Sequence, residues 1–569
     1  MDLMAIPGVR VLRTYERAWL PKDVVAGLVL TALLVPQGMA YAELAGLPPI
    51  TGLYTSVLCL IGYWLLGPSK ILVLGPDSAL GTMIAATILP LIGADQDPAK
   101  AIALASMLAL IVGGIMLLAG VAKLGFIADL LSMPTQIGYM NGLAITILVG
   151  QLPKLFGFSV DADGFIQELR GFVDGVLAGE TVGAALAVGA GALVVILVLQ
   201  RVMPKVPAVL VAVVLSILAV QLFDLTASGV SVIGTLPSGF PPFTIPDISL
   251  RDIPLLLGGA FGIVFVALAD TISTASSFAS RAGDRVHGNQ EMVGIGAANI
   301  AAGLFQGFPV STSGSRTAVA EQAGAKTQLT GLVGAAAIVV ILVAVPGLLK
   351  NLPQPALAAV VIAASLSLAD VKGVVQLWKK RKTEAWLAIA AFLAVTLFGV
   401  LPGIGIAVAL SILAVFRRTW WPYQAILGDT PDLPGFHDLA AHPDGKTYPG
   451  LVIFRFDAPL IFANARTFRE QVHELAEEPG LRWIVIASEP ITDVDTTASE
   501  MLEDLDEWLN ARGISLVFAE MKDPVQAKIR RYELLRTIDP AHFYPTIRAA
   551  VAGYKALVPL DPAPEKEET

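Results

Sequence analysis

Long runs of hydrophobic residues, separated by short polar or Gly/Pro-rich stretches, occupy most of the first 418 positions of the chain. About 20 apolar residues suffice for a helix that crosses a lipid bilayer. The pattern predicts fourteen membrane spans, at residues 24–44, 50–67, 72–92, 101–120, 125–150, 183–201, 206–222, 253–273, 290–306, 311–325, 329–347, 354–369, 384–400 and 403–416. It therefore predicts a polytopic α-helical membrane protein.

Lysine and arginine gather in every second connection between these spans. If the N-terminus is cytoplasmic, the outside connections hold only Lys100, Lys154, Arg170, Arg251 and Lys350. The inside connections hold Arg10, Arg13, Arg17, Lys22, Lys70, Lys123, Arg201, Lys205, Arg281, Arg285, Lys326, Lys372, Lys379, Lys380, Arg381, Lys382, Arg417 and Arg418. Because cytoplasmic loops carry an excess of Lys and Arg, we predict a multi-pass membrane protein with both termini in the cytoplasm.

The composition changes after Arg418. The chain has 38 Lys and Arg and 47 Asp and Glu; up to Arg418 the numbers are 24 and 22, and after it 14 and 25, so the net charge of −9 averages +2 and −11. Such a change indicates a domain boundary. We predict a cytosolic N-terminal segment (1–23), a transmembrane domain (24–418), a linker (419–449), a soluble domain (450–556) and a disordered, Pro-rich charged tail (557–569).

The acidic region has the pattern of a small α/β fold. Residues 450–464 predict two strands around a turn at Ala458–Pro459, and residues 482–489 and 514–520 predict buried strands. Helical patterns follow at 465–478, 497–513 and 523–535. Strands that alternate with helices favour a layered sheet.

Two segments within the apolar region predict broken helices. Residues 73–83 (VLGPDSALGTM) and 307–319 (GFPVSTSGSRTAV) each combine a proline with small polar residues ahead of a helix-forming run. They lie seven spans apart, so the second has inverted topology, and paired interrupted segments of this kind mark the binding site of many transporters. Each half-helix would direct its free N–H groups toward the middle of the bilayer, where they favour an anion.

Arg316 stands inside the second of these segments. A charge within the membrane is costly and needs a partner or a watery cavity, so Arg316 is a candidate for binding an anion. A structural alternative is an ion pair with Asp270 or Glu321. The neighbouring hydroxyls, as on Ser311, Thr312 and Ser313, also suit contacts between helices, and Asp77 after its proline also suits a helix N-cap.

Three further polar residues lie in otherwise apolar spans. Asp270 is the only charge in its predicted span, and intramembrane carboxylates often couple transport to protons or ions. Thr274 lies one turn further along the same face. Gln37 and Tyr41 form another i,i+4 pair, which suits either substrate contact or helix packing.

Other classes of site find little support in the sequence. A single cysteine, Cys59, rules out an internal disulfide and a cysteine-rich metal site. The five histidines have no metal-ligand spacing, and no nucleophile–base arrangement or P-loop is present. We therefore expect no enzyme, no metal site, no cofactor and no nucleic-acid partner.

Several stretches resemble the SLC26/SulP family of anion transporters. Residues 48–85, which contain GYWLLGPSKILVLGPDSALGTM, resemble the family signature, and residues 287–319 are similar to its ninth and tenth spans. LVIFRFDAPLIFANA (451–465) and DVDTTASEML (493–502) resemble its C-terminal STAS domain. The resemblance covers nearly the whole chain.

This resemblance implies a fold and a mechanism. The fold is a seven-plus-seven inverted repeat, in which spans 1–4 and 8–11 form a core domain and the others a gate domain. Members are usually homodimers in the membrane lipid that move sulfate, bicarbonate, chloride or dicarboxylates by an elevator-like shift. The family's anion-contacting positions fall on Gln37, Tyr41, Asp77, Ser78, Gly314, Ser315 and Arg316.

Departures from the family pattern refine the hypothesis. Chloride-conducting animal members have an aromatic residue at the position of Asp77. Sodium-binding relatives use residues that match Asp270 and Thr274 together with a threonine where this chain has Gly314. We therefore expect proton-coupled uptake of a small anion, sulfate above bicarbonate or dicarboxylate. The alternatives are an uncoupled anion channel or exchanger of the same fold and a nucleobase permease.

The STAS-like loop carries one more candidate. Thr497 matches the position that is phosphorylated in regulatory bacterial relatives, and a phosphate at the start of a helix is electrostatically favourable. The structural alternative is that Asp495 or Thr496 only caps the helix.

Overall fold

The computed structural model describes residues 7–92, 97–125, 132–160, 162, 164–203, 206–282, 286–430 and 433–557. The predicted features that lie outside these ranges are residues 1–6 of the N-terminal segment, residues 126–131 of the fifth span, Lys205, Arg285, residues 431–432 of the linker and residues 558–569 of the tail. The chain divides into two compact units, Met1–Ile412 and Leu413–Thr569.

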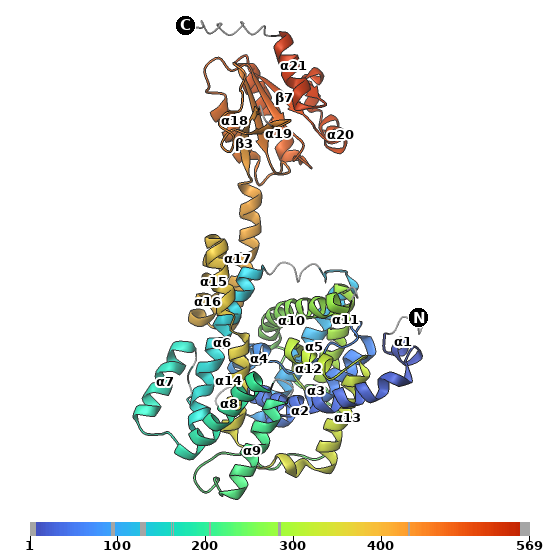
Figure 1. Cartoon of the computed structure of the whole chain (residues 1–569), viewed down its shortest axis with the longest axis vertical. Helices are drawn as coiled ribbons and strands as arrows, with labels where there is room; N and C mark the ends of the chain where they lie inside the picture. Colours follow the sequence, from blue (N-terminus) through green and yellow to red (C-terminus); the bar gives the residue numbers. More distant parts are fainter. Residues whose placement is uncertain are drawn as a thin grey trace. The chain divides into compact units, whose positions relative to one another are not determined.

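The first unit is a bundle of apolar helices that pack in two groups. One group contains α2 (Leu20–Leu44), α3 (Pro49–Leu66), α4 (Ser78–Ile92), α5 (Pro98–Val121), α10 (Ile253–Ala282), α11 (Gly288–Gly303), α12 (Gly314–Gln322) and α13 (Leu329–Ala344). The other contains α6 (Met133–Phe156), α7 (Phe165–Leu177), α8 (Gly183–Val202), α9 (Ala208–Leu222), α14 (Gln354–Leu368), α15 (Val371–Lys380) and α16 (Lys382–Phe398). Figure 1 shows the second group on the left of this unit. Helix α17 (Val400–Trp420) contributes Ile404 and Ala407 to the hydrophobic core of the unit.

Close packing of small residues holds each group together. A Cβ atom at Gly62 of α3 would lie 2.8 Å from the backbone of Ala298 in α11, and one at Gly138 of α6 would lie 2.1 Å from the Ala388 carbonyl oxygen in α16. Small residues permit this approach, and van der Waals packing of this kind drives helix association where no water is present.

Within the described residues, each of the fourteen predicted spans overlaps one of these helices, in two cases together with the short strand before it. Among the described residues, seven helices are long and apolar enough to cross a membrane, and α4, α9 and α13 are shorter apolar helices. The hydropathy pattern did not predict three further helices, α1 (Pro7–Arg13), α7 and α15. These are amphipathic or short, so they lack a long apolar run.

The two segments predicted to be irregular meet each other. Strand β1 (Leu74–Gly75) pairs antiparallel with β2 (Ser311–Thr312), so that Leu74 lies opposite Thr312 and Gly75 opposite Ser311. Helix α4 begins three residues after β1, and α12 begins two residues after β2. Strand pairing thus brings the N-termini of two short helices together although they are far apart in the sequence.

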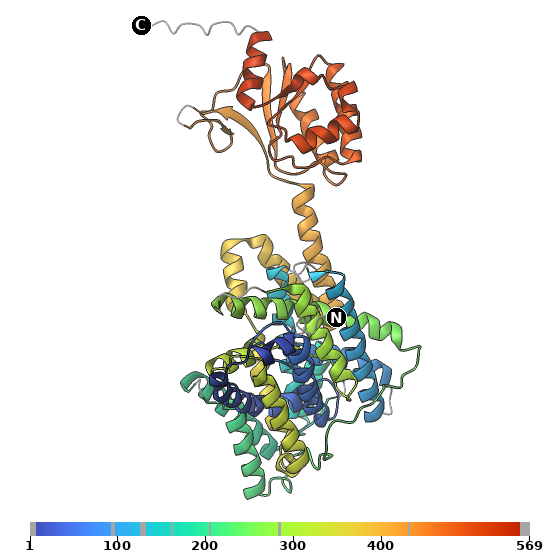
Figure 2. The ribbon, with the colours of Figure 1, turned by 90° about the vertical axis from the view of Figure 1, so that its right-hand side faces the viewer.

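The second unit is an α/β sandwich. Its sheet has the order β4-β3-β5-β6-β7-β8, in which β5 to β8 run parallel and β3 and β4 are antiparallel additions at one edge. The strands are β3 (Gln424–Asp429), β4 (Phe436–Asp438), β5 (Leu451–Phe456), β6 (Trp483–Ala487), β7 (Ser515–Ala519) and β8 (Phe543–Tyr544). Helices α18 (Ala465–Leu475), α19 (Thr496–Asn510) and α20 (Asp523–Arg531) pack on one face, and α21 (Ile547–Leu557) packs on the other (Figure 2).

Two features of this unit differ from the sequence prediction. The expected second strand after Ala458–Pro459 is wrong, because only Leu460 pairs there, in an isolated parallel bridge to Val494. Strands β3, β4 and β8 and helix α21 were not predicted. They are short or lie at the edges, and their pairing depends on the tertiary fold rather than on a local pattern.

Candidate substrate site

The candidate site lies where α4 and α12 begin. The carboxylate of Asp77 accepts a hydrogen bond from the Ala79 N–H at 2.8 Å. The hydroxyl of Ser313 accepts one from the Arg316 N–H at 3.4 Å as the N-cap of α12. Both helices are thus capped by a side chain from the segment in front of them, and their first N–H groups point toward the junction.

Side chains satisfy the irregular backbone that leads to these helices. The buried Asn299 amide accepts from the Val310 N–H at 2.9 Å and donates to the Val310 carbonyl at 3.3 Å. The Thr317 hydroxyl accepts from the Val73 N–H at 3.1 Å and donates to the Ser313 carbonyl at 2.8 Å. Non-helical backbone within a membrane protein requires such partners, and Thr317 links both interrupted segments.

Arg316 is a fully buried cation at this junction. Its side chain is 1% exposed, and Nε, Nη1 and Nη2 have no hydrogen-bond partner among the residues that the structure describes. The guanidinium packs on Gly75, where a Cβ atom would lie only 3.0 Å from Nη1. The alternative in which Arg316 serves as a hydrogen-bonded structural partner of Asp270 or Glu321 therefore does not describe this structure.

A cavity of about 1090 Å³ opens at the junction and brings the predicted residues of the membrane unit together. Gln37 and Tyr41 come from α2, Asp270 and Thr274 from α10, and the rest from the two interrupted segments. All nine predicted residues line it: Gln37, Tyr41, Asp77, Ser78, Asp270, Thr274, Gly314, Ser315 and Arg316. The cavity thus joins one cation, two carboxylates and several hydroxyls.

Further contacts order the polar lining. The hydroxyls of Ser313 and Ser315 share a hydrogen bond at 3.1 Å, and those of Tyr41 and Ser78 line the same cavity. Gln136 of α6 and Asp270 of α10 both line the cavity. Since α6 and α10 belong to different helix groups, both groups contribute polar side chains to it.

The sequence analysis missed the wall that faces the polar end of the cavity. Polar residues that it did not select include Gln136, Gln200, Ser273, Gln322 and Ser367. Apolar residues of α2, α9 and α14 complete the wall, among them Val29, Leu33, Val209, Val360 and Ala363. The sequence signal for part of this wall was the presence of side-chain amides within predicted spans, at Gln136 and Gln200. The apolar residues gave no such signal, because they resemble ordinary core positions.

The candidate regulatory residue lies in the second unit. Thr497 is exposed in the first turn of α19. Asp495 caps that helix, because its carboxylate accepts from the Ala498 N–H at 2.8 Å and from the Phe462 N–H at 2.7 Å. Asp495 therefore caps the helix, as the structural alternative proposed, and Thr497 is exposed.

Comparison with models of known protein families identifies the family of this chain. A model of the sulfate permease family matches residues 20–391, and a STAS domain model matches residues 442–550. The chain belongs to the sulfate permease (SulP/SLC26) family. A probable sulfate transporter of Mycobacterium tuberculosis (strain CDC 1551 / Oshkosh) is 41% identical over 551 residues, which cover 96% of this chain and 98% of the relative. The chloroplastic sulfate transporter 4.1 of Arabidopsis thaliana is 29% identical over 567 residues, covering 96% and 82%.

Solved structures of this family share the fold. SLC26A9 matches with a TM-score of 0.89 at 22% identity, covering 98% of this chain and 94% of that one. The transmembrane domain of the cyanobacterial bicarbonate transporter BicA matches with a TM-score of 0.59 at 21% identity, covering 70% and 98%. The chain is thus a helical membrane transporter with a C-terminal STAS domain, and its family consists of transporters rather than enzymes.

Proposed function

We propose that this member of the sulfate permease family is a secondary active anion transporter whose favoured substrate is sulfate. The observation that carries the proposal is Arg316, a buried guanidinium without a hydrogen-bond partner in the described structure, which lines a cavity beside two helix N-termini. A buried unpaired charge is costly, and an anion in the cavity would receive donors from Arg316 and from the hydroxyls around it. The names of the relatives add sulfate as the first substrate to test.

The carboxylates in the cavity support coupling to protons. Asp77 and Asp270 line the same space as Arg316, and an ionised carboxylate repels a dianion. Protonation removes this repulsion, so a proton and sulfate would enter together. Gly314 has no side-chain oxygen to offer a sodium ion next to Asp270 and Thr274, which favours H⁺ over Na⁺.

The two helix groups support an elevator-type movement. The polar end of the cavity comes from the group that contains α2, α4, α10 and α12, and much of its apolar wall comes from α9 and α14. In the proposed cycle the first group carries the anion past the second. We further propose a homodimer in the bacterial inner membrane with cytoplasmic termini, in line with the distribution of Lys and Arg.

Transport by the purified full-length protein in liposomes tests this function. We expect uptake of radiolabelled sulfate that an inward proton gradient accelerates and a protonophore abolishes, and that excess unlabelled sulfate reduces. Equal uptake with and without the gradient would reject proton coupling and favour the uncoupled channel or the exchanger.

The Arg316→Gln variant tests the site itself. Charge-assisted hydrogen bonds contribute about 1.5–3 kcal/mol each, so the KM for sulfate should rise roughly 10- to 100-fold. Arg316→Lys keeps the charge but loses the forked donors, so its KM for sulfate should lie between those of the wild type and Arg316→Gln. An unchanged KM in a variant that elutes as the wild-type oligomer would place the anion elsewhere.

A further inference from the structure

Helix α15 joins α14 to α16 and has an unusual surface for a connection. No residue of α15 is buried, although it contains three valines, a leucine and a tryptophan. Val371, Val375 and Trp378 are exposed by 65%, 48% and 43%. Their i, i+4 and i+7 spacing places them on one face of the helix.

The apolar ridge of α15, defined by Val371, Val375 and Trp378, continues onto the next helix. The ring of Trp378 contacts that of Trp386 at the start of α16, with 5.6 Å between their centroids, and Trp386 is 59% exposed. Tryptophan is enriched where the hydrocarbon of a bilayer meets the headgroups. Because α14 and α16 are apolar spans, a helix between their ends lies at this boundary.

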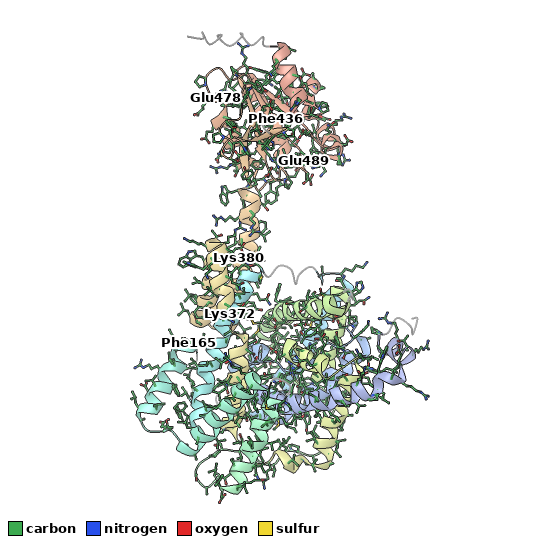
Figure 3. All side chains as sticks on the ribbon, viewed as in Figure 1. Phe165, Lys372, Lys380, Phe436, Glu478 and Glu489 are labelled. Atoms are coloured by element: carbon green, nitrogen blue, oxygen red, sulfur yellow. The ribbon has the colours of Figure 1, made fainter. Side chains whose placement is uncertain are left out.

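Two lysines, Lys372 and Lys379, flank the ridge, whereas Lys380 ends the helix on the side away from it. Lys372, Lys379 and Lys380 are exposed, and no ion pair engages them within the described structure. Figure 3 labels Lys372 and Lys380 on this helix. On a helical projection Lys372 and Lys379 stand next to Val375, so ammonium groups and apolar side chains share one edge. By contrast, Arg381 is already paired with Glu384 at 3.1 Å.

The N-terminal end of α15 is held by the protein. Asp370 caps the helix by accepting from the Gly373 N–H at 2.8 Å, and the Asp370 carbonyl accepts from the Asn141 amide of α6 at 3.3 Å. Asn141 directly follows Met140, which lines the substrate cavity. The position of α15 is therefore connected to the wall of that cavity.

The geometry points to a binding site for anionic phospholipids on α15. Acyl chains would cover the apolar ridge, and the phosphate of a lipid such as phosphatidylglycerol would contact Lys372 and Lys379. Amphipathic helices that combine apolar and basic faces bind membrane surfaces in this way.

Native mass spectrometry of the full-length protein, titrated with phosphatidylglycerol, tests this site. Each basic residue near an anionic surface strengthens binding about fivefold. Lys372→Gln/Lys379→Gln should therefore raise the dissociation constant of the tightest-bound phosphatidylglycerol by at least tenfold. Arg170→Gln/Lys350→Gln removes the same charge from exposed residues outside α15 and should behave as the wild type.

Two comparisons separate a lipid from other occupants. Phosphatidylcholine and soluble glycerol phosphate should bind far more weakly than phosphatidylglycerol. The proposal is overturned if glycerol phosphate binds equally well or if both double variants lose the lipid alike. It is also overturned if Lys372→Gln/Lys379→Gln changes only the oligomeric state, which would identify a second copy of the chain as the occupant.

Discussion

Gly75 shows at the scale of one residue how the chain creates room for a buried cation. Its missing side chain lets Arg316 lie against the backbone of β1, where a Cβ atom would stand 3.0 Å from Nη1 and 3.3 Å from the Leu34 Cδ2 atom. Arg316 and Leu34 are both buried, so neither side chain has room to move away from an added methyl group. The direction of the Arg316 side chain thus depends on a residue that itself contacts no substrate.

We expect Gly75→Ala to displace the guanidinium and weaken sulfate binding. An extra methyl group in a packed site costs about 1–3 kcal/mol, so the KM for sulfate should rise roughly tenfold in the liposome assay. Gly114→Ala is the matched control, because a Cβ atom there meets nothing within 4 Å. A Gly75→Ala variant with the wild-type KM would show that Arg316 does not need this backbone contact.

Asp506 offers a pH-dependent prediction outside the membrane unit. Burial in α19 raises the pKa of this carboxyl from about 4 to about 6, against an opposing hydrogen bond from the Asn510 amide at 2.9 Å. Because the pKa is higher in the folded than in the unfolded chain, the stabilising contribution is complete below pH 4 and is lost as the pH rises through 6. Asp506→Asn should therefore stabilise the STAS domain at pH 8 by about 1–2 kcal/mol, after allowance for partial solvation.

Hydrogen–deuterium exchange of α19 in the full-length protein measures this effect. Exchange in Asp506→Asn should be slower than in the wild type at pH 8 and equal at pH 4, once intrinsic rates are corrected. Asp504→Asn, on the exposed face of the same helix, is the control and should match the wild type at both values. Equal protection of Asp506→Asn and the wild type at pH 8 would contradict the prediction.

At the scale of elements, the short β1–β2 pairing holds the starts of α4 and α12 together. The Thr317 side chain adds hydrogen bonds to both interrupted segments. In Thr317→Val the Val73 N–H would lose its side-chain acceptor, and a buried unsatisfied group costs about 1–3 kcal/mol. We expect a lower Tm and weaker sulfate binding from this nearly isosteric change. Thr317→Ser keeps the hydroxyl and should retain both properties; loss of both in Thr317→Ser would instead assign the role to the methyl group.

The positions of the elements followed from hydropathy to different degrees. Within the described residues the predicted spans overlap helices, because a long apolar run in a membrane protein has few alternatives to a helix. The paired interruptions were also visible, since Pro76 and Pro309 stand among small polar residues. The apolar wall of the cavity was not visible, because Val209 and Val360 resemble ordinary packing residues until the fold shows a cavity beside them. Helices α7 and α15 lie along surfaces, so their short amphipathic runs gave no span.

At the scale of the whole membrane unit, the proposed elevator requires the two helix groups to move past each other. A Cβ atom at Gly262 of α10 would lie 3.4 Å from the Leu401 Cδ2 atom of α17, which the family resemblance assigns to the gate. In a Cys59→Ala background, we expect a cross-link between Gly262→Cys and Leu401→Cys to stop sulfate uptake and reduction to restore it. Gly331→Cys with Leu60→Cys has the same 3.4 Å approach within one group, between α13 and α3. Cross-linking this control pair should leave uptake intact, because its helices would travel together; continued transport through a fully cross-linked Gly262–Leu401 pair would mean that the substrate crosses without relative motion of α10 and α17.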